Sequence, residues 1–169
     1  MNSLPLEIER KYIIKMPDMS LIESQNGYTK SDIMQIYLES VGGVTHRVRS
    51  RAFDEKTVYT ETKKIRIDKM SSIEDEREIS KDEFLRLSNN QKQGTKAVCK
   101  TRFTLRHENF ILEIDVYPEW QKTCIMEIEL ESEAALVKIP DFIEILKEVT
   151  GDRKYTNAAM AEKFPEELI

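Results

Sequence analysis

The alternation of polar and apolar side chains along the first three quarters of the chain predicts β-strands. In the first such segment, Glu7, Glu9 and Lys11 fall on one side of a strand, and Ile8 and Tyr12 fall on the other. Seven further segments are strand candidates: 33–39, 44–51, 57–65, 73–79, 97–105, 110–117 and 124–131. We therefore expect a chain built mainly of strands, with turn signals between them.

Three short segments carry helical signals instead. Ser80 is followed three residues later by Glu83, which is the spacing of a capping box at a helix start. Apolar positions recur with helical spacing over 140–149, and Gly151 follows as a stop signal. A last short helix is expected over 157–164. These segments predict a small helical component beside the strands.

The charged faces of the predicted strands are segregated by sign. Arg47, Arg49 and Arg51 share one face of one strand, and sets of three glutamates share a face over 74–78 and over 127–131. One interpretation is the solvated outer face of a half-buried antiparallel sheet. The other is a barrel with a polar interior, covered outside by helices, in which a polyanion and metal cations neutralise the charges. The pattern alone leaves both open.

Composition narrows the class of protein. The 169 residues suit a single domain, 1–169, and 40% apolar residues allow a globular core. The net charge of −5 argues against a nucleic-acid-binding protein, because no global positive field attracts a polyanion. Cys99 and Cys124 lack metal-type spacing and are expected to be reduced thiols. We find no secretory signal and no membrane-spanning run, so a soluble cytoplasmic protein is expected.

Two strand motifs suggest metal and phosphate chemistry. Glu7 and Glu9 share a strand face about 6.6 Å apart, a spacing at which two carboxylates can share Mg²⁺ with water and phosphate oxygens. The guanidinium forks of Arg47 and Arg49 match phosphate oxygens bidentately. No P-loop motif and no Ser/His/Asp or Cys/His arrangement is present, so those mechanisms are unsupported.

The ordered set of motifs resembles the CYTH superfamily of triphosphate tunnel metalloenzymes. Its motifs are Glu7-x-Glu9-x-Lys11, Arg47-x-Arg49, Thr60-Glu61-Thr62-Lys63, Glu74-x-Glu76, Lys100-x-Arg102, Glu113-x-Asp115, Glu127-x-Glu129 and the C-terminal segment 149–157. Together they cover nearly the whole chain. The resemblance implies an α+β fold, with an eight-stranded antiparallel β-barrel that forms a tunnel with a polar interior and flanking helices.

The resemblance also implies a divalent-metal-dependent enzyme that acts on a small-molecule triphosphate. The residues expected to bind phosphate are Lys11, Arg47, Arg49, Lys63, Lys100 and Arg102. The expected ligands of Mg²⁺ or Mn²⁺ are Glu7, Glu9, Glu127 and Glu129. The supporting acidic residues are Glu74, Glu76, Glu113 and Asp115. Lys11 and Lys63 are the candidate catalytic residues, although the sequence does not show which lysine orients the water.

Several alternatives stay open at this point. Tripolyphosphate hydrolysis is favoured because no aromatic box for a base or a thiazole ring is evident. A thiamine triphosphatase and a class IV-type adenylyl cyclase are alternatives within the same family. A non-catalytic polyphosphate- or nucleotide-binding module is the alternative from another class, and a plain structural domain with a charged exterior is a third. A homodimer is compatible with the sequence.

Overall fold

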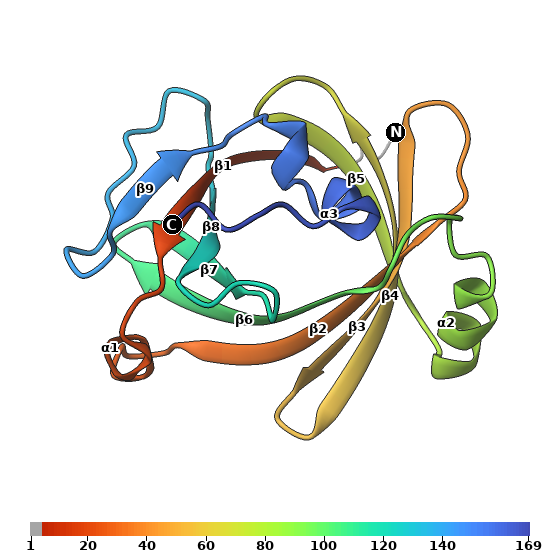
Figure 1. The fold of residues 1–169 in the computed structure, drawn as a ribbon, viewed down its shortest axis with the longest axis horizontal. Helices are drawn as coiled ribbons and strands as arrows, with labels where there is room; N and C mark the ends of the chain where they lie inside the picture. Colours follow the sequence, from red (N-terminus) through yellow and green to blue (C-terminus); the bar gives the residue numbers. More distant parts are fainter. Residues whose placement is uncertain (1–4) are drawn as a thin grey trace.

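A computed structural model describes residues 5–169, and in it eight antiparallel strands close into a barrel (Figure 1). The strands are β1 Leu6–Lys15, β2 Thr29–Leu38, β3 Val44–Phe53, β4 Lys56–Arg66, β5 Ser71–Ile79, β6 Val98–His107, β7 Phe110–Val116 and β8 Thr123–Glu129. Each overlaps a segment predicted from the alternation of side chains. The predicted α+β fold with a closed barrel is therefore confirmed.

The barrel closes through a short pairing between β1 and β5. Neighbouring strands follow the order β5-β4-β3-β2-β6-β7-β8-β1, and β1 then pairs with β5. Only three residues of β1, Leu6 to Ile8, pair with β5, whereas seven residues, Glu9 to Lys15, pair with β8. The edge of β1 beyond Ile8 is therefore free to pair with another segment.

A ninth strand, β9 (Ile145–Glu148), occupies this free edge of β1. It pairs with Tyr12 to Ile14, and the backbone N–H of Val149 then donates to the carbonyl oxygen of Lys11. The prediction of a helix over 140–149 is therefore wrong. An unpaired strand edge presents backbone groups that need partners, and this requirement outweighs the helical spacing of the apolar residues.

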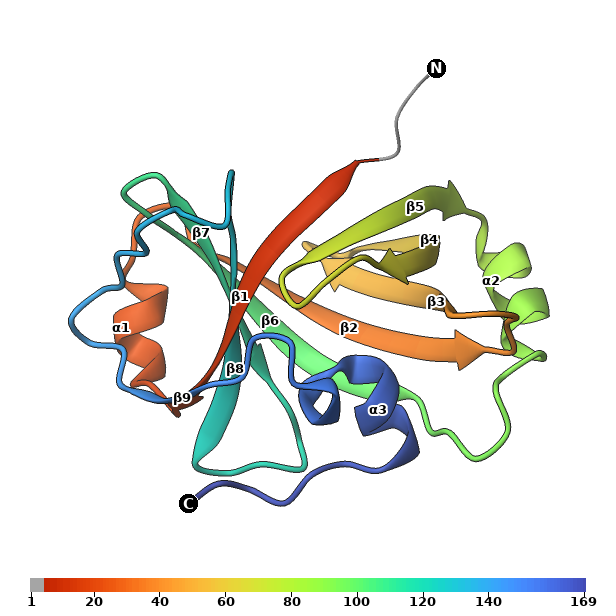
Figure 2. The same ribbon diagram turned by 90° about the horizontal axis from the view of Figure 1, so that it is seen from above.

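The helices are short and lie outside the strands, except at the C-terminus. They are α1 Met19–Glu23, α2 Lys81–Ser88, the 3₁₀ helix η1 Arg153–Tyr155, and α3 Asn157–Glu162. The hydroxyl of Ser80 accepts from the backbone N–H of Glu83, as the capping box predicts. Figure 2 shows α1 and α2 at opposite ends of the molecule. No helix within residues 5–169 is long and apolar enough to cross a membrane.

The outward face of the barrel carries most of the apolar core. Tyr12 and Ile14 of β1 pack in one cluster with Phe103, Leu112 and Met126 of the strands that follow. Because side chains alternate along a strand, burying these residues on the outside directs the charged residues between them into the barrel. The predicted polar interior follows from this alternation.

The C-terminal plug, residues 153–164, fills part of the barrel interior. Inward-facing Ile13, Tyr37 and Tyr117 pack against Tyr155 and Met160 of the plug. Figure 1 shows α3 within the ring of strands. The interior is thus divided between an apolar part, covered by the plug, and a part lined by charged side chains.

Candidate active site inside the barrel

The pairing register determines which charged residues face inward. Arg47 lies opposite Tyr37 and Thr62, and Arg49 lies opposite Gln35 and Thr60. Cross-strand partners share a face of the sheet. Since Tyr37 packs against the plug inside the barrel, both arginines project into the interior. Arg51, two residues further along β3, shares this face.

The arginines of β3 have few carboxylate partners. The guanidinium of Arg47 lies 3.9 Å from Glu74, and its Nε is buried with no hydrogen-bond partner among residues 5–169. Arg49 Nε donates to the side-chain oxygen of Gln35, and no described carboxylate lies within 4.0 Å of its guanidinium. Burial and the nearby Arg47 and Arg102 lower the pKa of Arg49 to about 10. Positive charge is therefore in excess beside β3.

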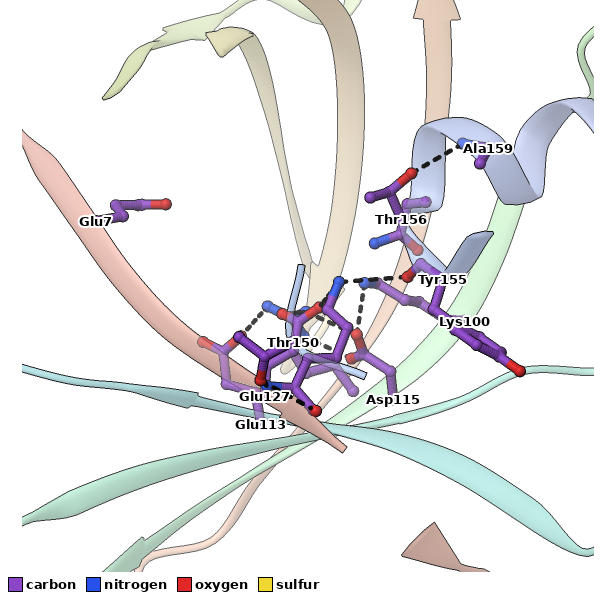
Figure 3. Close-up of polar contacts among 12 residues, drawn as sticks. Glu7, Lys100, Glu113, Asp115, Glu127, Thr150, Tyr155, Thr156 and Ala159 are labelled. Carbon is purple, nitrogen blue, oxygen red and sulfur yellow. Dashed lines mark hydrogen bonds and ion pairs between the residues drawn. The ribbon is translucent and has the colours of Figure 1, made fainter. Parts of the chain in front are cut away.

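The two inward-facing cations of β6, Lys100 and Arg102, are in contrast paired with carboxylates. Lys100 Nζ donates to Asp115 at 2.6 Å, and neither side chain has any exposed surface. Arg102 donates to both oxygens of Asp115 and also contacts Glu113 and Glu127. Figure 3 shows Lys100, Asp115, Glu113 and Glu127 close together inside the barrel.

Lys100 and Arg102 respond differently to this shared burial. Burial, followed by the adjacent Arg102, lowers the pKa of Lys100 to about 8. Burial alone would also lower the pKa of Arg102, but Asp115 raises it well above its usual value. Lys100 is therefore the cation of this pair that loses its proton most readily.

Lys11 links β1 to the plug. Its ammonium lies 3.1 Å from Glu127 and donates to the backbone carbonyl of Tyr155 at 3.3 Å. Burial alone would lower the pKa of Lys11, but Glu127 and Glu9 raise it, so the lysine stays protonated. Burial would likewise raise the pKa of Glu127, whereas Lys11 and Arg102 hold it well below its usual range.

The structure corrects the prediction for the lysine of β4. Lys63 lies opposite His46 and Asp75 on the outer face of the barrel and is exposed. Its neighbour Lys64 faces inward, with Nζ 2.8 Å from Glu74. Lys63 is therefore not among the residues that line the interior, and Lys64 takes its place.

Acidic side chains gather where β1 meets β4 and β5. Glu7 lies 3.9 Å from Lys64, and Glu9 pairs in register with Glu129 of β8. Burial, then the nearby Glu74, raises the pKa of Glu7 to about 7. Burial and Glu127 raise the pKa of Glu9. The negative charge of these neighbouring carboxylates is therefore only partly compensated by the positive charge beside them. Figure 3 shows Glu7 directed into the barrel.

The donor chemistry of this acidic cluster suits a hard divalent cation. Mg²⁺ commonly takes one or two carboxylates and completes its coordination with water and substrate oxygens. Within residues 5–169, no group of three or more His, Cys, Asp or Glu side chains is arranged to hold a metal ion. Glu127 already accepts from Lys11 and Arg102. Glu7 and Glu9 are the better candidates for a metal shared with substrate.

The remaining predicted acidic residues support the walls. The side chain of Glu76 accepts from the hydroxyl of Thr62, and Glu113 contacts Arg102. Besides Lys64, the inward-facing residues that sequence reasoning missed include the neutral Gln35 and Tyr37. The carbonyl of Gln35 orients Arg49, a role that only the register between β2 and β3 reveals.

Two of the cavities formed by residues 5–169 bear on the location of the site. A cavity of about 410 Å³ is lined by Arg49 and Arg51 of β3 and by Thr60 and Glu76. A larger cavity of about 750 Å³ includes the outward-facing Tyr59 and the α2 residue Phe84 in its lining. Charged side chains of β3 and β5 line the smaller cavity, and the other inward-facing charges lie around it. We therefore place the site inside the barrel, although the cavity beside α2 is larger.

Solved structures share this architecture. The inorganic triphosphatase NE1496 has a TM-score of 0.60 and 26% sequence identity, covering 95% of this chain and 97% of that one. The PH1819 protein from Pyrococcus horikoshii OT3 has a TM-score of 0.59 and 23% identity, covering 80% of each chain. No family model matches the chain, and no curated protein matches it either.

A closed eight-stranded barrel with inward-facing arginines, lysines and glutamates defines a triphosphate tunnel fold. The likeness to NE1496 along nearly the whole length of both proteins supports the CYTH superfamily. The resemblance predicted from the order of the charged strands is confirmed at this level.

Proposed function

We propose that this protein is a divalent-metal-dependent triphosphatase that hydrolyses inorganic tripolyphosphate to pyrophosphate and phosphate inside the barrel. The observation that carries the proposal is the excess of positive charge beside β3. Arg49 has no carboxylate partner within the described chain, and Arg47 keeps a buried Nε without an acceptor. Buried donors are almost always satisfied, so an unpaired one inside a cationic cavity favours an anionic ligand.

The phosphate ligands follow from the side chains that face this interior. They are Lys11, Arg47, Arg49, Lys64, Lys100 and Arg102. Phosphoryl transfer depends chiefly on positioning the phosphate chain of the substrate and neutralising its charge. The arginines offer planar forks for phosphate oxygens, and Lys11, whose pKa is raised, keeps its charge at neutral pH.

Glu7 and Glu9 are the residues that would hold Mg²⁺ or Mn²⁺, with Glu129 as the neighbouring carboxylate. Such a metal supplies further charge neutralisation at the phosphate oxygens and lowers the pKa of water. Glu127 has a different role, because its two oxygens fix Lys11 and Arg102. Glu74 holds Lys64 in place beside Glu7.

Lys100 is the candidate proton acceptor for the attacking water. A general base works best when its pKa is close to the operating pH, and the pKa of Lys100 is lowered to about 8. Lys11 is unsuited to this role because its pKa is raised. Asp115 holds the Lys100 ammonium at 2.6 Å and fixes its orientation.

Tripolyphosphate is the preferred substrate for two reasons. NE1496, which shares the fold along almost its full length, is an inorganic triphosphatase. The aromatic rings of Tyr37 and Tyr117 are covered by Tyr155 and its neighbours in the plug, so they offer no stacking surface for a base or a thiazole ring.

A phosphate-release panel tests the proposal. Tripolyphosphate, thiamine triphosphate and ATP are each incubated with Mg²⁺ or Mn²⁺, and products are separated by chromatography. We expect tripolyphosphate to be hydrolysed fastest, and Arg49→Ala to raise its KM far more than the exposed control Lys138→Ala. Equal KM values for the two variants would show that Arg49 does not bind substrate.

A further inference from the structure

The row of inward-facing arginines on β3 continues beyond the residues of the family motif. Arg51 follows Arg49 at the same period of two, and its Nε donates to the buried hydroxyl of Ser31 at 3.0 Å. The four steps along the strand from Arg47 to Arg51 span about 13 Å. The cationic row is therefore longer than the part that Arg47 and Arg49 provide.

A second cation stands beside Arg51 at the mouth of the barrel. Lys56, the first residue of β4, lines the same cavity of about 410 Å³ as Arg49 and Arg51. The turn between β3 and β4 contains the acidic residues Asp54 and Glu55. Within the described chain, however, no carboxylate lies within 4.0 Å of the charged nitrogens of Arg51 or Lys56.

This lack of carboxylate partners is shared with Arg49 and distinguishes Arg51 and Lys56 from the lysines of the deeper site. Lys11, Lys64 and Lys100 each have a carboxylate within about 3.1 Å. Cations that lack partners in a concave site keep their full attraction for an anion, whereas paired cations have part of it neutralised. Phe53 and Val58 add apolar walls to this cavity.

Resting on the proposed function, we propose that Arg51 and Lys56 form an additional phosphate subsite at the barrel mouth, so that the protein binds linear polyphosphates longer than three units. A fourth phosphate then contacts Arg51 and Lys56, while Arg47 and Arg49 hold the units further inside. Arg47 in turn lies next to Glu74 and so leads toward the acidic cluster.

The reaction on a four-unit chain balances without any further reactant. The oxygen of water bonds to the terminal phosphorus, and the bridging P–O bond of that unit breaks. The electron pair of that bond stays with the departing chain, and the proton from water is released through the base to solvent. The products are orthophosphate and tripolyphosphate.

Calorimetry with inorganic tetrapolyphosphate and tripolyphosphate, without metal so that no turnover occurs, tests the subsite. The wild-type protein should bind tetrapolyphosphate more tightly. In the Arg51→Gln/Lys56→Gln variant, the affinity for tetrapolyphosphate should fall about tenfold or more, the factor expected from one or two lost charge-assisted hydrogen bonds. The affinity for tripolyphosphate should change far less.

The Lys96→Gln/Lys122→Gln variant is the control. It removes the same charge outside the cavity and should bind tetrapolyphosphate and tripolyphosphate as the wild type does.

Three outcomes would overturn the subsite. Equal losses for both ligands would assign Arg51 and Lys56 to the triphosphate site, and unchanged binding of both would show that the two residues contact no phosphate. A third result would assign the mouth to an organic group. In it, Phe53→Ala weakens the binding of thiamine triphosphate or ATP, and Arg51→Gln/Lys56→Gln leaves the binding of tetrapolyphosphate unchanged. The hydrolysis assay distinguishes the proposed function: selective tetrapolyphosphate binding with tripolyphosphate left intact contradicts hydrolysis and keeps the subsite.

Discussion

The ammonium of Lys64 lies 2.8 Å from a carboxylate oxygen of Glu74 inside the barrel. The contact crosses from β4 to β5 and also brings Lys64 to 3.9 Å from Glu7 on β1. Lys64 thus joins three strands at the place where the barrel closes. Its neighbour Lys63 is on the opposite face of the same strand and takes no part in this arrangement.

This pair of lysines gives a matched test of which face is functional. We predict that Lys64→Met lowers kcat/KM for tripolyphosphate at least about tenfold, because it removes a charged contact to substrate and leaves Glu74 without its nearest cation. Lys63→Met should retain nearly full activity, since the side chain is exposed on the outside. Steady-state kinetics of the two variants check the prediction, and similar losses in both would contradict the inward assignment of Lys64.

The lowered pKa of Lys100 predicts a specific pH dependence. The neutral amine becomes populated as the pH rises through about 8 instead of the ordinary lysine value. If this amine accepts the proton from water, kcat should rise between about pH 7 and 9. In Lys100→Arg, which keeps the positive charge throughout this range, kcat should be low and the rise should disappear. A pH–rate profile with the same rise in Lys100→Arg would exclude Lys100 as the base.

Glu7 and Glu9 predict how activity depends on metal. Glu7→Gln and Glu9→Gln should each abolish most turnover while the fold survives, because an amide oxygen is a weaker ligand for a hard cation than a carboxylate. Direct Mn²⁺ binding should weaken in both variants. Glu119→Gln, which alters an exposed residue outside the barrel, is the control. Wild-type metal affinity and activity in both variants would refute the assignment.

The plug predicts a loss of stability that is separate from catalysis. Tyr155 is 4% exposed and packs with Trp120 and the inward face of the barrel. Tyr155→Ala should lower the free energy of unfolding by about 3 kcal/mol, the usual cost of truncating a buried aromatic side chain. The backbone carbonyl that accepts from Lys11 is retained in this variant. Denaturant unfolding beside the exposed control Lys154→Ala measures the effect, and equal stabilities would show that the plug does not pack as described.

The strands and the polar interior could be predicted because they depend on local alternation, but the face of β4 could not. Along this strand the outward residues Glu61 and Lys63 are charged, whereas the inward residues Thr60 and Thr62 are neutral. The alternation therefore identified the wrong face as the functional one. The outward charges have a structural reason: Glu61 accepts from His46 and Arg77 on the outside of the barrel.

The segment over 140–149 shows a second limit of sequence reasoning. Its apolar residues recur with helical spacing, but Ile145 to Glu148 form a strand on the open edge of β1. That edge exists because β5 pairs only as far as Ile8, a long-range feature with no local signal. The following turn is similarly constrained, since a side chain at Gly151 would meet Lys69 at 2.9 Å and the φ of Gly151 is +76°.

The identity of the products from tripolyphosphate tests the central claim most directly. Purified protein is incubated with tripolyphosphate and Mg²⁺ or Mn²⁺ in ¹⁸O-labelled water, and the products are followed by ³¹P nuclear magnetic resonance. Hydrolysis needs only a bound triphosphate and one positioned water, whereas cyclisation of ATP needs a ribose hydroxyl held in line with the α-phosphorus. We predict equal amounts of pyrophosphate and orthophosphate, with one labelled oxygen per cleavage. Intact tripolyphosphate, with cyclic AMP as the main product from ATP under the same conditions, would contradict the account.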